Sequence, residues 1–93
     1  MEVLQEDKGN KGKFYIMLNG VQKAEMTYTW VGADKFIIDH TEVNEALKGK
    51  SAGKQMLMKA VEFARANNLK IIPLCPFANS VFQKTPEIRD VLD

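Results

Sequence analysis

A glycine- and lysine-rich loop that runs directly into a helical pattern is the part of the sequence best suited to chemistry. It lies within Leu47 to Met56 and contains Lys48, Gly49, Lys50, Ser51, Ala52, Gly53 and Lys54. The first amides of a helix have no acceptor inside it, and the helix dipole adds roughly half a positive charge there. Glycine lets the backbone approach a bulky anion, and the lysines add mobile ammonium groups. The loop therefore predicts a phosphate site, which we interpret as the pyrophosphate cradle of a coenzyme.

The three lysines also have a plainer interpretation, as solvated residues that merely decorate the start of a helix. Cations are disfavoured at that end of a helix because its dipole is positive there. Their placement is thus unfavourable unless an anion binds nearby, which favours the phosphate hypothesis.

Three other side chains could take part in a reaction. Cys75, next to Pro76, would be a nucleophile if its pKa fell below about 8.5, but no neighbour in sequence supplies the necessary cation, and cysteine is commonly a small buried hydrophobe. His40 is the only histidine, and with an ordinary pKa of about 6.5 it could accept a proton or serve as a structural hydrogen-bonding group. Glu42 could be a base, directly or through water, or a solvated carboxylate.

The first half of the chain predicts strands that would position these residues. After a polar stretch from Met1 to Gly12, for which we expect a short strand and a loop, Phe14–Leu18 and Val21–Trp30 flank Asn19-Gly20, the strongest short hairpin signal. A further β-rich run covers Phe36–Val43. We expect an antiparallel meander, in which the aromatic residues Tyr28, Trp30 and Phe36 are structural.

In the second half of the chain, the spacing of the apolar residues changes from that of a strand to that of a helix. Apolar residues recur every three or four positions from Ala52 to Asn67, which predicts one helix with a buried stripe. Leu69–Cys75 reads as a strand that completes a β-α-β unit with the run ending at Val43. Phe77–Lys84 and Pro86–Leu92 read as short helices, the second with Thr85 as N-cap and proline at its first position.

Two prolines near the last strand indicate an opening in the sheet. Proline cannot donate to a sheet ladder and is confined to edges, ends and bulges, so Pro73 and Pro76 predict a strand that is poorly paired on one side. If this strand diverges from Phe36–Val43, a wedge opens where an extended ligand could bind unpaired backbone groups. A plain edge strand is the alternative.

Composition limits the other classes of protein. A chain of 93 residues, 45% hydrophobic and 27% charged, suits a single globular domain over residues 1–93. Its net charge of +1 creates no long-range field to gather nucleic acid. One cysteine excludes an internal disulfide, and no Cys/His set has zinc spacing. Because there is no internal disulfide, we expect a reducing, cytoplasmic location. Met1 to Lys13 has no apolar run, so we expect neither a signal peptide nor a membrane anchor.

Three blocks in order give the chain a family resemblance. They are Asp39–Val43, Leu47–Lys54, and Pro73–Phe77 followed by Thr85–Glu87, and together they resemble the very small single-domain GCN5-related N-acetyltransferases. The coenzyme loop of that family reads Gln/Arg-x-x-Gly-x-Gly/Ala. The pattern falls on Lys48, Ser51 and Gly53, so the first two positions depart from it. Lys48 keeps the charge, and Ser51 can serve if its backbone needs no left-handed conformation.

The resemblance implies an α+β fold: a mixed, mostly antiparallel sheet with splayed strands, one long helix and short C-terminal helices. It implies acetyl-coenzyme A in the wedge and acetyl transfer to an amine, on a small molecule or a protein side chain, in an open acceptor site. The loop amides from about Lys50 to Lys54 would grip the pyrophosphate, and the backbones of Glu42 and Val43 would hold the pantetheine arm.

Two functions from different classes follow. We favour direct attack by the amine in a ternary complex over a Cys75 acyl-enzyme, because it needs fewer perturbed groups. The alternative is a non-catalytic module that binds acyl-coenzyme A or recruits a partner with the same fold.

Overall fold

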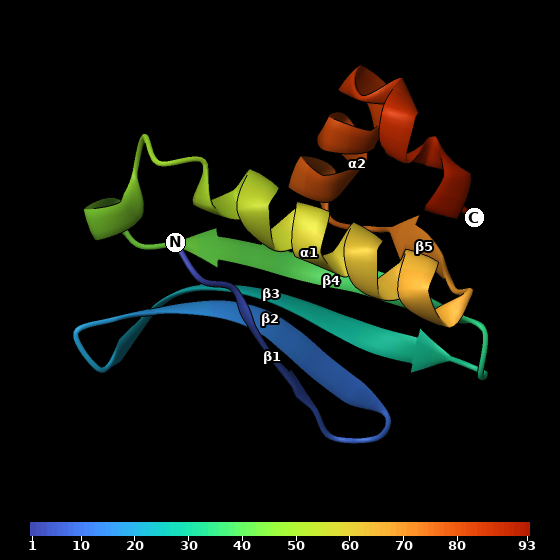
Figure 1. The fold of residues 1–93 in the computed structure, drawn as a ribbon, viewed down its shortest axis with the longest axis horizontal. Helices are drawn as coiled ribbons and strands as arrows, with labels where there is room; N and C mark the ends of the chain where they lie inside the picture. The colour runs from blue at the N-terminus through green and yellow to red at the C-terminus, as the bar shows by residue number, and fades with distance from the viewer.

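A computed structural model describes all 93 residues as one five-stranded sheet with helices packed against it (Figure 1). The strands lie side by side in chain order; the first four are antiparallel, and the last pairs with β4 in parallel. The strands are β1 (Leu4–Asp7), β2 (Lys11–Leu18), β3 (Val21–Val31), β4 (Lys35–Val43) and β5 (Lys70–Pro73). The helices are η1 (Glu45–Leu47), α1 (Ala52–Asn67), α2 (Pro76–Lys84) and η2 (Pro86–Val91).

The expected α+β architecture is confirmed, including the meander and the parallel unit β4-α1-β5. The hairpin between β2 and β3 turns at Asn19 and Gly20, whose φ angles of 53° and 78° are both positive. Two positive φ angles at the centre of a two-residue hairpin loop match the twist of the flanking strands. The sequence signal Asn-Gly therefore has the expected physical cause.

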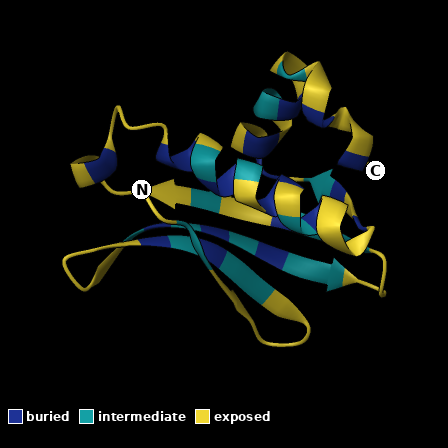
Figure 2. Ribbon diagram, in the orientation of Figure 1, coloured by how far each residue is buried: buried dark blue, intermediate teal, exposed yellow.

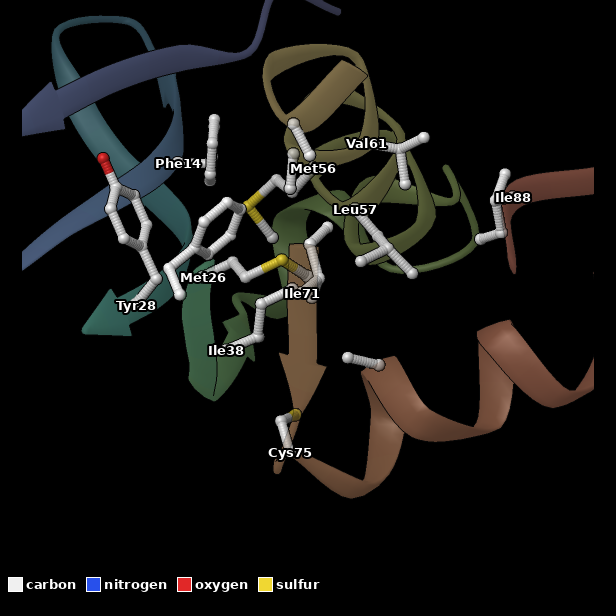
Figure 3. Packing of buried hydrophobic residues seen from close by; sticks show 14 of the residues in the cluster. Phe14, Met26, Tyr28, Ile38, Met56, Leu57, Val61, Ile71, Cys75 and Ile88 are labelled. Atoms are coloured by element: carbon white, nitrogen blue, oxygen red, sulfur yellow. The ribbon is translucent and has the colours of Figure 1, made fainter. Parts of the chain in front are cut away.

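The core lies between the sheet and the inner face of α1. Seven residues of α1 are buried, at the three- and four-residue spacing that the sequence predicts, and they pack on inward-facing side chains of the strands (Figure 2). Phe14, Met26 and Ile38 come from three neighbouring strands and meet Met56 and Leu57 of the helix (Figure 3). The opposite face of the sheet carries no helix (Figure 1). On the covered face α1 lies over β2, β3 and β4, while α2 adds contacts to β4 and η1 adds contacts to β3.

Several boundaries differ from the sequence-based expectations. The last strand covers only Lys70–Pro73, because Pro73 ends its ladder, and α2 begins one residue early with Pro76 at its first position. The predicted helix at Pro86–Leu92 is a 3-10 helix that ends at Val91, and the side chain of Thr85 makes no capping hydrogen bond. The short η1 was not predicted; the side chain of Asn44 caps it by accepting from the Ala46 amide at 2.9 Å.

The β4–β5 pair is short, and its end creates a fork. Pairing runs from Lys35↔Lys70 to Ile38↔Pro73 and stops there, while β4 continues to Val43. The Cys75 amide donates to the Ile38 carbonyl at 3.0 Å and closes the apex. Beyond that point no strand pairs with β4 on this side. None of the helices is both long enough and apolar enough to cross a lipid bilayer.

Candidate functional site: a helix-head loop beside a strand fork

Two residues of the loop before α1 have a left-handed backbone conformation. Gly49 has a φ of 79°, and Ser51, the last residue before the helix, has φ 57° and ψ 34°. The condition under which serine was expected to replace the family's glycine is therefore not met, because Ser51 is in the left-handed region. Its side chain makes no capping hydrogen bond that would compensate. The loop thus holds a residue in a conformation that glycine adopts more readily.

Four consecutive amides at the head of α1 are free. The first backbone hydrogen bond of the helix runs from Gln55 N to the Ser51 carbonyl at 2.9 Å. The preceding amides, Ser51 to Lys54, donate to no group of the protein. The Gln55 side chain donates to the Lys50 carbonyl at 3.0 Å and fixes the loop on the helix. The loop therefore holds free backbone donors on a fixed backbone, which is what an anion site would require.

Gly53 is required by close packing at this junction. A Cβ atom at Gly53 would lie 2.7 Å from Cζ and 2.9 Å from Cε2 of Phe77, the second residue of α2. The ring of Phe77 therefore covers the first turn of α1. This contact links the loop to the segment that follows the fork.

The fork has an apolar rim. Leu74 is 68% exposed, Val43 41% and Phe77 39%. Val43 ends the unpaired part of β4, and Leu74 and Phe77 flank the Cys75-Pro76 segment that follows β5. A ligand that covers exposed apolar side chains is stabilised by about 25 cal/mol for each Å² of apolar surface removed from water. The rim and the unpaired strand backbone together suit an extended, partly apolar chain.

A bulge in β4 decides which side chains face this fork. Tyr28 pairs with Ile38 and Thr27 with His40, so Asp39 is an extra residue in β4. The inward positions therefore change from Phe36 and Ile38 to Thr41 and Val43, because a bulge of one residue shifts the alternation.

His40 and Glu42 consequently face the open side of the sheet. Their side chains are 60% and 68% exposed, and His40 Nε2 lies 2.9 Å from Glu42 Oε1. Cys75 lies on the other side, is only 5% exposed and has the Thr41 hydroxyl 3.3 Å from its sulfur. Figure 3 shows Cys75 at the end of β5, in line with Ile71 and Ile38. The three candidate side chains therefore do not form one cluster: His40 pairs with Glu42, and Cys75 pairs with Thr41.

Thr41 is the polar residue at the fork that sequence reasoning missed. Simple alternation from Phe36 and Ile38 places His40 inward and Thr41 outward. The strand itself carries no clear signal for this, because Phe36, Ile37 and Ile38 are all apolar and so do not fix which positions face inward.

A cavity of about 530 Å³ adjoins the loop on the far side of α1. Ser51 and Lys54 line it together with Met58 and the N-terminal residues Met1 and Val3. Apolar and cationic groups are thus available next to the free amides, and the carboxylates of Glu2 and Glu62 line the same cavity. No cluster of three or more His, Cys, Asp or Glu side chains could hold a metal ion.

Comparisons with known proteins agree with this geometry. The family described as GCN5-related N-acetyl-transferase matches residues 13–91. Protein NATD1 of Danio rerio is 31% identical over 84 residues, which cover 89% of this chain and 76% of that protein. A GCN5-like candidate N-acetyltransferase from Staphylococcus aureus, solved by NMR, is 40% identical with a TM-score of 0.74, covering 99% of this chain and 87% of that one.

A more distant structure shares the fold. A predicted acetyltransferase from Clostridium acetobutylicum, solved with acetyl-CoA, has a TM-score of 0.64 at 16% identity, covering 80% of this chain and 55% of that one.

Proposed function

Because the chain belongs to the GCN5-related N-acetyltransferase family, we propose that it transfers an acetyl group from acetyl-coenzyme A to an amine. The observation that carries the proposal is the row of free amides from Ser51 to Lys54, directly beside the fork where β4 loses its partner. Donors of this kind at a helix head suit a pyrophosphate. The exposed apolar rim of the fork suits the pantetheine arm.

The chain offers a place for each part of the coenzyme. Pyrophosphate fits the free amides, with Lys48, Lys50 and Lys54 nearby. The backbone of β4 from Asp39 to Val43 is available to the arm, because no strand uses it on this side. The cavity beside the loop, with Met58 and Lys54 in its lining, is a place for the nucleotide end.

We assign the proton chemistry to the pair on the open side of the sheet. An amine must lose a proton to attack the thioester carbon; the C–N bond then forms as the C–S bond breaks. His40, 2.9 Å from Glu42, can accept that proton while the carboxylate stabilises the resulting imidazolium. Thr41 and Cys75 are hydroxyl and thiol donors on the coenzyme side of the fork, where the departing sulfur needs a proton. Cys75 needs no covalent role in this scheme.

The second candidate is a module that binds acyl-coenzyme A without transfer. The departure of Lys48 and Ser51 from the family's loop pattern favours it. The uncovered face of the sheet also leaves an acceptor without an enclosing pocket.

Turnover assays separate the two functions. The protein is mixed with acetyl-coenzyme A and a panel of primary amines, and free thiol is measured. We expect release that depends on the amine, a large loss of turnover in Glu42→Gln, and little loss in the matched variant Glu45→Gln, whose carboxylate lies in η1. Coenzyme binding without thiol release from any amine would favour the module. Full turnover in Cys75→Ala would remove the acyl-enzyme route.

Calorimetry tests the coenzyme site separately. Reversing two loop charges in Lys50→Glu/Lys54→Glu should weaken coenzyme A binding at least tenfold, because both ammonium groups border the free amides. The control Lys11→Glu/Lys84→Glu makes the same change in net charge on β2 and α2, away from the loop. Equal weakening in both variants would show a general charge effect and contradict the assigned site.

A further inference from the structure

A second cavity lies at the opposite end of α1 from the coenzyme loop. Its volume is about 690 Å³, and it is lined by Gln5, Asp7, Gly9, Trp30, Ala33, Phe63, Asn67 and Leu69. The helix has 16 residues and is therefore about 24 Å long, so this cavity is remote from the free amides at the helix head. The proposed acetyl transfer makes no use of it.

The cavity contains one carboxylate with an unusual set of partners. Asp7 Oδ2 accepts from the Tyr28 hydroxyl at 2.7 Å and from the Trp30 indole at 2.8 Å, and Oδ1 accepts from the Gly9 amide at 2.8 Å. All three donors are neutral, and no Lys, Arg or His forms an ion pair with Asp7. The hydrogen bond from Tyr28 is the main reason that the pKa of Asp7 is lowered, so the group is charged at neutral pH.

The surroundings favour a positive ligand. The rings of Trp30 and Phe63 both line the cavity, with centroids 6.1 Å apart and planes 70° apart. Aromatic faces attract ammonium groups. Asn67 ends α1, so the negative end of its dipole also points to this region. No cationic side chain lines the cavity.

We propose that this cavity binds a primary alkylammonium ion, with Asp7 as its counter-ion and Trp30 and Phe63 as its apolar walls. The alkyl part lies against the rings, and the ammonium group takes the remaining lone pair of the carboxylate. One helix then offers an anion site at its head and a cation site at its end, as its dipole favours at both ends.

Trp30 makes the proposal directly testable, because it is the only tryptophan in the chain. Its fluorescence and the NMR signal of its indole N–H are followed during titration with n-butylammonium chloride at constant ionic strength. We expect a saturable change with n-butylammonium and none with 1-butanol, which has a similar shape but no charge. No saturable change, or an equal change with 1-butanol, would overturn the proposal.

Two variants test whether the Asp7 carboxylate is the group that binds the ammonium ion. Asp7→Asn should weaken binding about fivefold, the effect of a unit charge at contact distance in a solvent-exposed site. Glu6→Gln removes the same charge from the neighbouring residue, which lines a different cavity on the open side of the sheet, and should change nothing. Equal affinity in these two variants would refute the assignment of Asp7.

A third variant covers the possibility that Asp7→Asn loosens β1. Ala33→Glu adds a carboxylate to the exposed edge of the cavity without touching the hydrogen bonds of Asp7. It should tighten n-butylammonium binding severalfold. If Asp7→Asn does not fold, unchanged or weaker binding in Ala33→Glu decides against the proposal.

Discussion

Replacing Ser51 by glycine should stabilise the protein. Ser51 has φ 57° and ψ 34°, a left-handed conformation that costs a residue with a Cβ atom roughly 1–2 kcal/mol. Glycine avoids this strain but loses about 0.4–1 kcal/mol more conformational entropy on folding. The net gain for Ser51→Gly is therefore about 0.5–1 kcal/mol, or about 2–8 °C in Tm for a domain of this size.

The measurement is the unfolding midpoint in urea and on heating. Ser51→Ala is the first control: the serine side chain makes no capping bond, so alanine should leave stability nearly unchanged. Asn68→Gly is the second, because Asn68 is the C-cap that follows α1 and has a similar φ of 59°, and asparagine tolerates that conformation better than serine. Its gain should be smaller. If Ser51→Gly is no more stable than Ser51→Ala, the strain inferred from the backbone angles does not exist.

Three further predictions follow from the packing and the charges. In a urea double-mutant cycle, Gly53→Ala and Phe77→Leu should couple by about 1 kcal/mol, because the smaller side chain relieves the 2.7 Å approach; additive effects would contradict this. Asp7 has a lowered folded pKa, so its contribution to stability is present above its ordinary pKa of 3.8 and lost as the pH falls through the folded value. Tyr28 has its pKa raised to about 12, mainly by burial, so its contribution is complete below pH 10 and is lost as the pH rises to about 12. In urea midpoints measured across pH, Asp7→Asn should abolish the loss of stability at acid pH. Tyr28→Phe should abolish the loss at alkaline pH and also reduce the loss at acid pH, because the Tyr28 hydroxyl is the main cause of the lowered Asp7 pKa. Arg65 donates to both Asp90 oxygens, at 2.9 and 2.7 Å, and to the Glu87 carbonyl at 2.8 Å; Arg65→Lys cannot reproduce this fork, so amide exchange in η2 should accelerate while the global midpoint hardly moves.

Elements encoded by short-range patterns were predictable from the sequence. Alternation and the Asn19-Gly20 signal predict the hairpin, and the three-four spacing predicts α1 to its last residue, Asn67. These signals act within a few residues, so no tertiary information is needed. The prolines left a fork and a plain edge strand as alternatives, and β5 is both, since it lies at the edge of the sheet and its pairing with β4 ends at Pro73.

The arrangement of side chains around the fork was not predictable in the same way. One extra residue, Asp39, turns His40 and Glu42 to the open side and brings Thr41 to Cys75. A bulge depends on the pairing with β3, a long-range contact that local alternation does not contain. The left-handed conformation of Ser51 was unpredictable for the same kind of reason. Serine does not favour this conformation, and the course of the chain between η1 and α1 imposes it.

An NMR titration of the ¹⁵N-labelled protein with coenzyme A tests the central claim most directly. If the helix head holds the pyrophosphate, the backbone amides of Ser51 to Lys54 should show the largest shifts, followed by those of Thr41 to Val43 along the unpaired strand. The indole signal of Trp30, at the other end of α1, should stay in place. Saturable binding that leaves the four loop amides unmoved, or no binding at all, would contradict the account.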